Sequence, residues 1–427
     1  MDPSGHKWLF SLISNMHQNM AARLLIIKKL IYKFGSIDDF FHFYIHSSGL
    51  FYGHATHHLL SDFNSEKTWS HADHYKVSIT EGLFAAYFFV HKEKLVKKEN
   101  ISDLILEAQE KIYDFYILYA IEEGYFKKRK PFFLFNTHNK HSILEKLEKI
   151  IDYRINNLSM LTRGFWKGSQ FNIFSYIDIL YFIHWLQGDY LYDKRSDIKK
   201  SILKTMIATS NTNPEQIEHQ IIHYYITSGN LQKKTATELY KDIAQHITID
   251  NICGQFEQPH IINRLMLEHA IIVLLSNQTE EESKNDYLQK LSKLCGISED
   301  ELQYSNLLIE NFISHNKEHI LYTRHKFRFA YITGNFTSRF HTFFIKNRSK
   351  IITELSQNRE LLELLWKAKN EKLSVEEREK VKSQIINLLK TIPSLTIFMI
   401  PGGSIILPLL LKILPEELLI PSSFRNK

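Results

Sequence analysis

The sequence predicts an all-α protein, and three observations support this fold class. The chain of 427 residues contains only 15 Gly and 9 Pro, roughly half or less of the average usage of about 7% and 5%. Apolar residues recur at spacings of three and four, which is the period of amphipathic helices. A hydrophobic content of 44% with 23% charged residues is ordinary for a globular protein with a buried core. We therefore expect a soluble multi-helix body, followed by an apolar C-terminal membrane segment that prolines punctuate.

The first half of the chain contains a series of predicted helices. Residues 15–34 place Met16, Met20, Leu24 and Ile27 at spacings of three and four, with basic residues among them, as in an amphipathic helix. The same apolar stripe recurs in later stretches, which polar or charged residues separate from one another. We therefore expect further helices over residues 75–96, 101–121, 142–157, 171–187, 197–208 and 214–228.

Signals for helix boundaries are clearest in residues 262–315. Leu288, Leu291 and Leu294 form one apolar stripe, and Gly296 follows it at the position where a left-handed residue commonly ends a helix. The segment is predicted to contain three helices, with a loop after the first and a turn after the second. Capping boxes, in which an N-cap hydroxyl and an N3 carboxylate exchange hydrogen bonds with the backbone, are predicted for Thr279/Glu282, Ser298/Glu301 and Ser374/Glu377.

The same segment resembles the repeating unit of TerB-type tellurite-resistance domains, where a loop and a Gly-Ile-Ser-like turn connect similar helices. The resemblance implies a helical fold. Ser276, Asn277 and Gln278 stand where that family carries acidic residues that can bind metal. The resemblance therefore does not extend to a metal site.

Changes of composition along the chain predict its division into regions. Residues 162–171 contain Gly164 and Gly168 among polar residues, which is typical of a linker. The predicted regions are an N-terminal helical domain at 1–161, a middle helical region at 162–260, a TerB-like helical unit with a basic and aromatic stretch at 261–353, amphipathic helices at 354–390, and a membrane segment at 391–427.

Histidine is frequent, at 22 residues, but its pattern does not define a metal site. Pairs one helical turn apart, His219/His223 and His315/His319 among them, can ligate zinc or iron, yet a site needs a third ligand. No HExxH motif and no nearby cysteine supplies one. We expect no metal and no cofactor, and the stretch 42–74 is the one place where metal binding stays open. We interpret its histidines as partly exposed: His42, His46, His54, His57, His58, His71 and His74.

No motif in the sequence predicts catalysis. The nucleophile elbow GxSxG, the phosphate-binding P-loop and the dinucleotide fingerprint GxGxxG are all absent. Cys253 and Cys295 have no CxxC partner, which favours a reducing compartment, and the N-terminus lacks the pattern of a secretory signal. We expect a non-enzymatic protein with no catalytic residues, whose bulk is cytoplasmic and for which no small-molecule substrate is identifiable.

A basic and aromatic stretch at 319–353 is the first candidate interface. It contains no acidic residue, in a chain of net charge +6 and pI near 8.9. Such a stretch can bind nucleic acid through phosphates and base stacking, or lie on an anionic bilayer. A pair of amphipathic helices with buried aromatics is the third interpretation. The candidate residues for an anionic surface are Arg324, Lys326, Arg328, Arg339, Lys346, Arg348 and Lys350.

Residues 391–411 form the candidate membrane segment, because they contain no ionisable side chain. A helix of this length, at about 1.5 Å per residue, extends roughly 30 Å and can cross the hydrocarbon core. Lysines precede it, and Lys412 follows it. Pro401 interrupts its middle, so a kinked span, a re-entrant hairpin and two buried helices all stay open. Membrane insertion is the interpretation that the charge-free length favours, and the preceding lysines favour a cytoplasmic position for the rest of the chain.

Five prolines, about seven residues apart, punctuate the segment 391–424: Pro393, Pro401, Pro408, Pro415 and Pro421. With this pattern the segment resembles the membrane-segment hallmark of the LETM family of inner-membrane proteins implicated in cation/proton exchange. That hallmark has prolines spaced along an apolar run, a Leu-Pro pair, a Lys-then-apolar-Pro step and a closing Leu-Pro-Ser-Thr-Phe. The resemblance is nearest to bacterial LETM-related proteins described as biofilm-associated, and it implies the inner membrane of a bacterium. The matching residues are Pro393, Phe398, Pro401, Leu407, Pro408, Lys412, Pro415, Pro421, Ser422 and Phe424.

One departure from the family pattern limits the activity that we expect. Gly402, Gly403 and Ser404 replace an aromatic-Met-acidic sequence, so the segment lacks the carboxylate that is a natural handle for protons or cations. We therefore expect an adaptor, structural or cation-homeostasis-linked role. A component of a K⁺/H⁺ exchange system and a ribosome- or RNA-associated protein are the alternatives. The expected partners are the lipid bilayer, with the ribosome and a second copy of the chain as further candidates.

Overall fold

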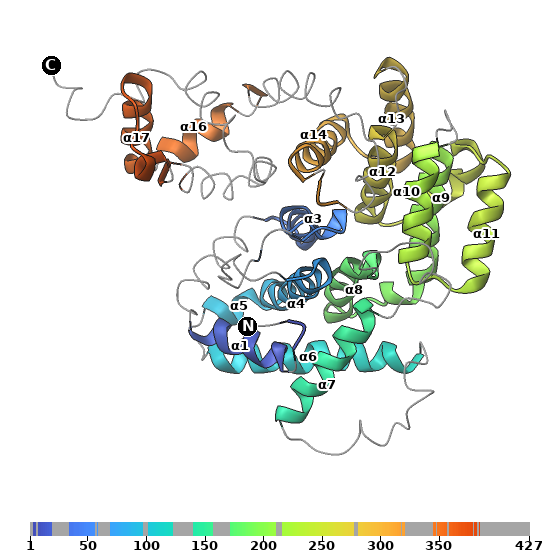
Figure 1. Ribbon diagram of the computed structural model, residues 1–427, viewed down its shortest axis with the longest axis horizontal. Helices are drawn as coiled ribbons and strands as arrows, with labels where there is room; N and C mark the ends of the chain where they lie inside the picture. The colour runs from blue at the N-terminus through green and yellow to red at the C-terminus, as the bar shows by residue number, and fades with distance from the viewer. Residues whose placement is uncertain are drawn as a thin grey trace. The chain divides into compact units, whose positions relative to one another are not determined.

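The described part of the chain is helical throughout. Every regular element there is an α-helix or a 3-10 helix (Figure 1), which confirms the all-α class. Among these residues, no helix has both the length and the apolarity that crossing a membrane requires. The predicted membrane segment 391–427 lies outside them. The computed structural model describes residues 3–5, 7–18, 34–55, 58, 69–96, 101–122, 140–156, 171–210, 216–276, 281–316, 318–320, 345–346, 348–356, 358–378, 380–381 and 384.

The chain forms two compact units. The first comprises Met1–Ile297 with Ile320–Tyr322, and the second comprises Ser298–His319 with Thr323–Lys427. The finer division into five regions stays a prediction, and the proposed linker around Gly164 lies outside the described residues.

The first unit contains most of the described helices, and several of their bounds match the predicted stripes. Most of the predicted helix 15–34 lies outside the described residues, and the helix Trp8–Gln18 overlaps only its start. The predicted helix 101–121 is α6, and the one at 142–157 is α7. The stretch 75–96 is divided at His91 into α4 and α5. The elements are α1 Trp8–Gln18, α3 Ile37–Ser47, η1 Leu50–Tyr52, α4 His71–Val90, α5 Lys92–Val96, α6 Ile101–Glu122, α7 Lys140–Asn156, η4 Ile173–Tyr176, α8 Ile177–Leu186, η5 Leu191–Lys194, α9 Arg195–Ser210, α10 Gln216–Ser228, α11 Lys233–Ala244, η6 Ile249–Phe256, α12 His260–Leu275 and α13 Glu281–Cys295.

Helix α4 passes through the N-terminal part of this unit with its whole circumference covered. Every side chain from Tyr75 to Phe89 is buried, and the helix packs against α8, α6, α7 and α3. Ser70 begins it with a capping box, because its hydroxyl accepts from the Asp73 N–H while the Asp73 carboxylate accepts from the Ser70 N–H. A helix that is buried on all sides is a core element and not an amphipathic surface helix.

Helix α12, in the C-terminal part of the first unit, is also a core helix. It packs against α9, α13 and α10 (Figure 1), and every side chain from Ile261 to Leu274 is buried. Because this buried run includes Arg264 and Glu268, α12 brings two charged groups into the interior.

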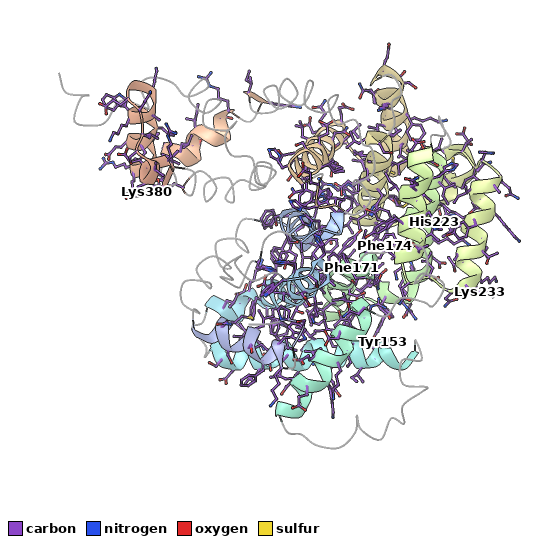
Figure 2. All side chains as sticks on the ribbon, in the orientation of Figure 1. Tyr153, Phe171, Phe174, His223, Lys233 and Lys380 are labelled. Atoms are coloured by element: carbon purple, nitrogen blue, oxygen red, sulfur yellow. The ribbon has the colours of Figure 1, made fainter. Side chains whose placement is uncertain are left out.

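Side chains sort between core and surface as this packing requires (Figure 2). Phe171 and Phe174 are completely buried, whereas Tyr153 and Lys233 are exposed. Phe171 contacts the Tyr75 ring at a centroid distance of 4.4 Å. The residue that ends the predicted linker is thus part of the core of the first unit.

The described helices of the second unit are α14 Glu299–Asn316, α16 Arg348–Ser356 and α17 Arg359–Asn370, of which α16 packs against α17. The capping boxes at Ser298/Glu301 and Ser374/Glu377 are confirmed, since each carboxylate accepts from the N-cap N–H and each hydroxyl accepts from the N3 N–H. In the first unit, Gly296 follows α13 and is left-handed, with φ of +67°, as predicted. Thr279 lies outside the described residues.

Candidate metal centre

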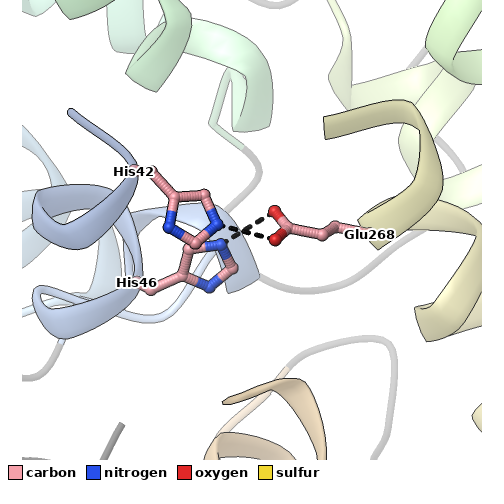
Figure 3. Close-up of side chains that lie close together, drawn as sticks. All are labelled: His42, His46 and Glu268. Carbon is pink, nitrogen blue, oxygen red and sulfur yellow. Dashed lines mark hydrogen bonds and ion pairs between the residues drawn. The ribbon is translucent and has the colours of Figure 1, made fainter. Parts of the chain in front are cut away.

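Two histidines and one glutamate meet inside the first unit. His42 and His46 lie one turn apart on α3, and Glu268 comes from α12 (Figure 3). Nε2 of His42 lies 2.6 Å from Oε1 of Glu268, and Nε2 of His46 lies 3.0 Å from Oε2. Each imidazole therefore contacts a different oxygen of a single carboxylate.

The local sequence explains why α3 presents both imidazoles on the same side. Ser36 is the N-cap and accepts from the Asp39 N–H, so the helix begins at Ile37, five residues before His42. Residues four apart in a helix lie on one face, which places His42 above His46. Their ring centroids are 4.5 Å apart. The relative position of the two imidazoles is therefore determined by α3 itself and does not depend on α12.

All three side chains are withdrawn from solvent. The side chains of His42 and His46 are 4% and 1% exposed, and that of Glu268 is fully buried. Arg264, one turn before Glu268 on the same helix, places its Nε 3.4 Å from Oε1 of that carboxylate. The cluster thus combines one buried acid, one buried guanidinium and two imidazoles.

Burial and the neighbouring charges determine the protonation of the cluster. Burial, assisted by the Arg264 charge, lowers the pKa of His42 to about 3, and burial also lowers the pKa of His46. Burial raises the pKa of Glu268, but the facing imidazoles outweigh it, and the carboxyl pKa lies well below its ordinary value. At neutral pH we therefore expect an ionised carboxylate facing two neutral imidazoles, the forms that bind metal ions.

Aromatic side chains hold the histidines in place. The Tyr52 hydroxyl, on η1, lies 2.8 Å from Nδ1 of His46, and the Phe51 ring lies 4.5 Å from the His46 ring. Phe51 also contacts His269, whose Nδ1–H donates to the Leu265 carbonyl. Tyr52 acts on the ring nitrogen that does not face Glu268, which is the arrangement that orients a metal-ligating histidine.

This arrangement has two chemical uses. It can serve as a buried hydrogen-bond network in which each imidazole donates Nε2–H to the carboxylate. It can also hold a cation, because one nitrogen of each histidine and one carboxylate oxygen all lie within 4.8 Å of one another. Among the described residues, this is the one group of three metal-ligating side chains whose ligand atoms lie this close together.

The interpretation of these histidines as partly exposed is wrong for His42, His46 and His54, which are buried. The HxxxH spacing on α3 was visible in the sequence, but the third ligand stands 222 residues beyond His46. One signal for Glu268 was present: it and Arg264 are the only acidic or basic side chains, histidine aside, in the apolar run 261–275. Since a charged group in such a run is buried only if it is paired, the run indicated a polar partner elsewhere in the fold.

The other described histidines of the stretch 42–74 contact one another in pairs, and within the described part of the chain they belong to no further three-ligand group. His54 and His71 place their Nδ1 atoms 3.2 Å apart. His58 Nε2 lies 3.0 Å from Nδ1 of His74, and its Nδ1 lies 3.9 Å from a Glu81 oxygen. His57 lies outside the described residues.

The histidine pairs predicted elsewhere have other partners. His223 on α10 lies 2.7 Å from the Tyr240 hydroxyl. His315 on α14 contacts the backbone carbonyl of Asn311, at 2.8 Å.

Most residues of the two predicted interfaces lie outside the described part of the chain. This holds for all ten residues of the LETM-like segment 391–424 and for four of the basic candidates, Arg324, Lys326, Arg328 and Arg339. Lys346 is exposed and pairs with Asp300, and Arg348 is exposed at the start of α16. Lys350 is a residue of α16 whose side chain is not among those described. The anionic-surface assignment stays a prediction.

Compared with protein-family models, curated proteins and solved structures, the chain shows no match to any of them.

Proposed function

We propose that this chain is a LETM-related, membrane-anchored helical protein without enzymatic activity, with an adaptor or cation-homeostasis-linked role at a bacterial inner membrane. The single observation that carries the proposal is the segment 391–411, which has no ionisable side chain and is flanked by lysines. Burying about 20 apolar residues in a bilayer is strongly favourable, while one central charge would cost about 2.5–3.5 kcal/mol. The five-proline pattern through Pro421 supports the family relationship.

The lack of a carboxylate in 391–411 favours an anchor over an exchanger. A proton or cation pathway through the bilayer needs polar or ionisable groups along it, and this segment supplies hydroxyl groups only. The anchor is therefore the first proposal, and membership of a K⁺/H⁺ exchange system is the alternative. Potassium-dependent proton flux in vesicles that contain only this chain would favour the alternative.

Membrane anchoring is tested by fractionation. The full-length chain is expected in carbonate-washed membranes, and a chain that ends at Lys390 is expected in the supernatant. As a finer variant, Ile405→Lys with Leu409→Lys introduces two charges into the apolar segment, and the matched control, Lys372→Gln, alters a residue outside it. Full-length protein in the carbonate supernatant would contradict the proposal, as would membrane retention of the truncated chain.

The two cysteines report on which side of the membrane the first unit lies. Cys253 is exposed, whereas Cys295 is buried. A membrane-impermeant maleimide is therefore expected to label Cys253 in inverted inner-membrane vesicles and not in intact spheroplasts. Cys253→Ser is the control that removes the rapid label. Labelling in spheroplasts would place the first unit on the opposite side.

Ribosome or RNA association is the remaining alternative, and the basic stretch 319–353 is its basis. If this alternative holds, the full-length chain cosediments with ribosomes in a salt-dependent manner, and Arg324→Glu with Arg328→Glu releases it. Lys290→Glu on α13 is the matched change of charge outside the stretch. If the membrane fraction contains the chain after ribosomes are removed, the anchor proposal is retained.

A further inference from the structure

We propose that His42, His46 and Glu268 bind a divalent first-row transition-metal ion, with Zn²⁺ as the first candidate. This inference goes beyond the proposed membrane function and does not depend on it, because all three residues belong to the first unit. It concerns the stretch 42–74, the one place where the sequence left metal binding open.

The observed distances fit a site that needs only a small expansion. The two nitrogen–oxygen distances are 2.6 and 3.0 Å. Zinc–ligand bonds of about 2.0–2.2 Å in tetrahedral geometry separate ligand atoms by about 3.3–3.5 Å. The first distance would have to increase by about 0.7–0.9 Å and the second by about 0.3–0.5 Å, which rotation of the Glu268 side chain can supply.

The ligand types select the class of cation. Two imidazole nitrogens and one carboxylate oxygen suit Zn²⁺, Fe²⁺, Co²⁺ or Ni²⁺, whereas Mg²⁺ and Ca²⁺ prefer sites made of oxygen alone. Three protein ligands leave the fourth tetrahedral position for water or another small ligand. The site is therefore of the two-histidine, one-carboxylate type.

Tyr52 makes the required change of histidine tautomer possible. In the metal-free network, Nε2 of His46 donates its proton to Glu268. To ligate a metal ion, Nε2 must be unprotonated, and the proton moves to Nδ1. The Tyr52 hydroxyl, 2.8 Å from Nδ1, can donate in the first case and accept in the second. His46 therefore keeps a hydrogen-bond partner in both states.

The positive charge of Arg264 should weaken cation binding at this site, and substituting Arg264 therefore tests the proposal. Its guanidinium charge lies next to Glu268, with Nε 3.4 Å from Oε1, so it competes electrostatically with a cation for that carboxylate. If the cluster is a metal site, Arg264→Gln should tighten metal binding. If the cluster is only a hydrogen-bond network, the same change removes an ion pair and creates no metal affinity.

The experiment uses the full-length chain, purified in mild detergent and stripped with a chelator. Because the cluster is buried, the chain is incubated with Zn²⁺ or Co²⁺ before excess ion is removed. We expect one bound ion per chain by elemental analysis, and Co²⁺ absorption bands of low-symmetry four-coordinate character. Glu268→Gln and His46→Gln should weaken binding at least about 100-fold. Tyr52→Phe, which removes a hydrogen bond to a ligand, should weaken it about 10-fold.

The matched control is His223→Gln. His223 forms an i,i+4 pair with His219 on α10, and it contacts the Tyr240 hydroxyl at 2.7 Å. This variant should bind metal as the wild type does. Circular dichroism melts without metal show whether each variant is folded, so loss of the ion is separated from loss of the fold.

Three outcomes would overturn the proposal. The first is a wild-type chain that retains neither Zn²⁺ nor Co²⁺ after incubation. The second is a folded Glu268→Gln chain with the Co²⁺ spectrum and affinity of the wild type, which would place the ion elsewhere. The third is an Arg264→Gln chain that stays folded and binds metal more weakly than the wild type. Each result can be obtained whether or not the chain is membrane-anchored.

Discussion

His42 contacts Glu268 through a hydrogen bond of 2.6 Å that joins α3 to α12 across 226 residues of sequence. The contact is buried, and the same carboxylate also faces His46 and Arg264. Arg264 and both imidazoles lose their shared partner if the carboxylate is removed. This dependence makes the position sensitive to substitution even when no metal ion is present.

Glu268→Leu in the metal-free chain should lower the free energy of unfolding by about 3–5 kcal/mol, because it leaves the Arg264 charge buried without this carboxylate. Glu257→Leu is the exposed control, and its effect should stay within about 0.5 kcal/mol. Urea unfolding followed by circular dichroism measures both. A Glu268→Leu chain as stable as the wild type would show that the cluster is hydrated in solution.

Asp178 forms a second buried charge pair, with Arg154. Its two oxygens accept from Nε and Nη2 of Arg154 at 2.7 and 2.8 Å, and the pair joins α7 to α8. Asp178→Asn should cost about 3–5 kcal/mol, since a buried guanidinium loses its counter-charge. The double variant Arg154→Met/Asp178→Leu should cost less than the single one, because apolar residues can fill the space.

The control for this pair is an exposed pair of the same charge type. Lys290 donates to Asp250 at 2.9 Å, and their side chains are 53% and 70% exposed. Asp250→Asn should cost less than about 1 kcal/mol, because solvent screens exposed pairs. Equal losses at Asp178 and Asp250 would contradict the assignment of Asp178 to the interior.

Gly82 permits the close approach of α4 to α3 and α8. A Cβ built there would lie 2.5 Å from Cε1 of Tyr44 and still closer to Cδ1 of Ile179. Gly82→Ala should therefore destabilise the chain by about 1–3 kcal/mol through overpacking, although alanine favours a helix by about 1 kcal/mol. Gly254→Ala is the control, because its Cβ would meet nothing within 4 Å. A stabilised Gly82→Ala chain would show that the helices separate readily.

The sequence predicted the helices well because their boundaries depend on local interactions. The stripe that predicted 101–121 matches α6, Ile101–Glu122, and the capping box at Ser298 forms as expected. The start of α4 was placed at Tyr75 and not at His71, because the Ser70–Asp73 spacing, a further capping signal, was not used. The error is four residues, about one turn.

Only the two histidines of the candidate site could be recognised in the sequence, because the site depends on tertiary packing and not on local interactions. The pair His42/His46 has a helical spacing that can be seen in the sequence, but its function depends on Glu268, which only the packing of α3 and α12 brings near. Periodicity carries no information about which helix faces which. A buried charge in the apolar run of α12 indicates that a partner exists, and only the tertiary fold identifies it.

The two cysteines should differ sharply in reactivity. Burial raises the pKa of the Cys295 thiol to about 12, whereas Cys253 is exposed. Because the thiolate is the reactive form, iodoacetamide at pH 8 should modify Cys253 in the native chain and leave Cys295 unmodified until urea unfolds it. Peptide mass spectrometry locates the label, and Cys253→Ser should abolish rapid modification. Fast native labelling of Cys295 would contradict its burial.

The same burial makes the fold sensitive to alkali. The raised pKa of Cys295 is accompanied by that of Tyr287, which burial also raises to about 12. Between about pH 9 and pH 12 the unfolded chain loses these two protons while the folded chain keeps them, so stability falls as pH rises. Each group should contribute a slope of about 1.4 kcal/mol per pH unit within its window. Urea midpoints measured from pH 8 to pH 11 should fall for the wild type and fall less for Tyr287→Phe, which lacks the ionisable hydroxyl. An identical pH dependence in the two chains would rule out a contribution from Tyr287.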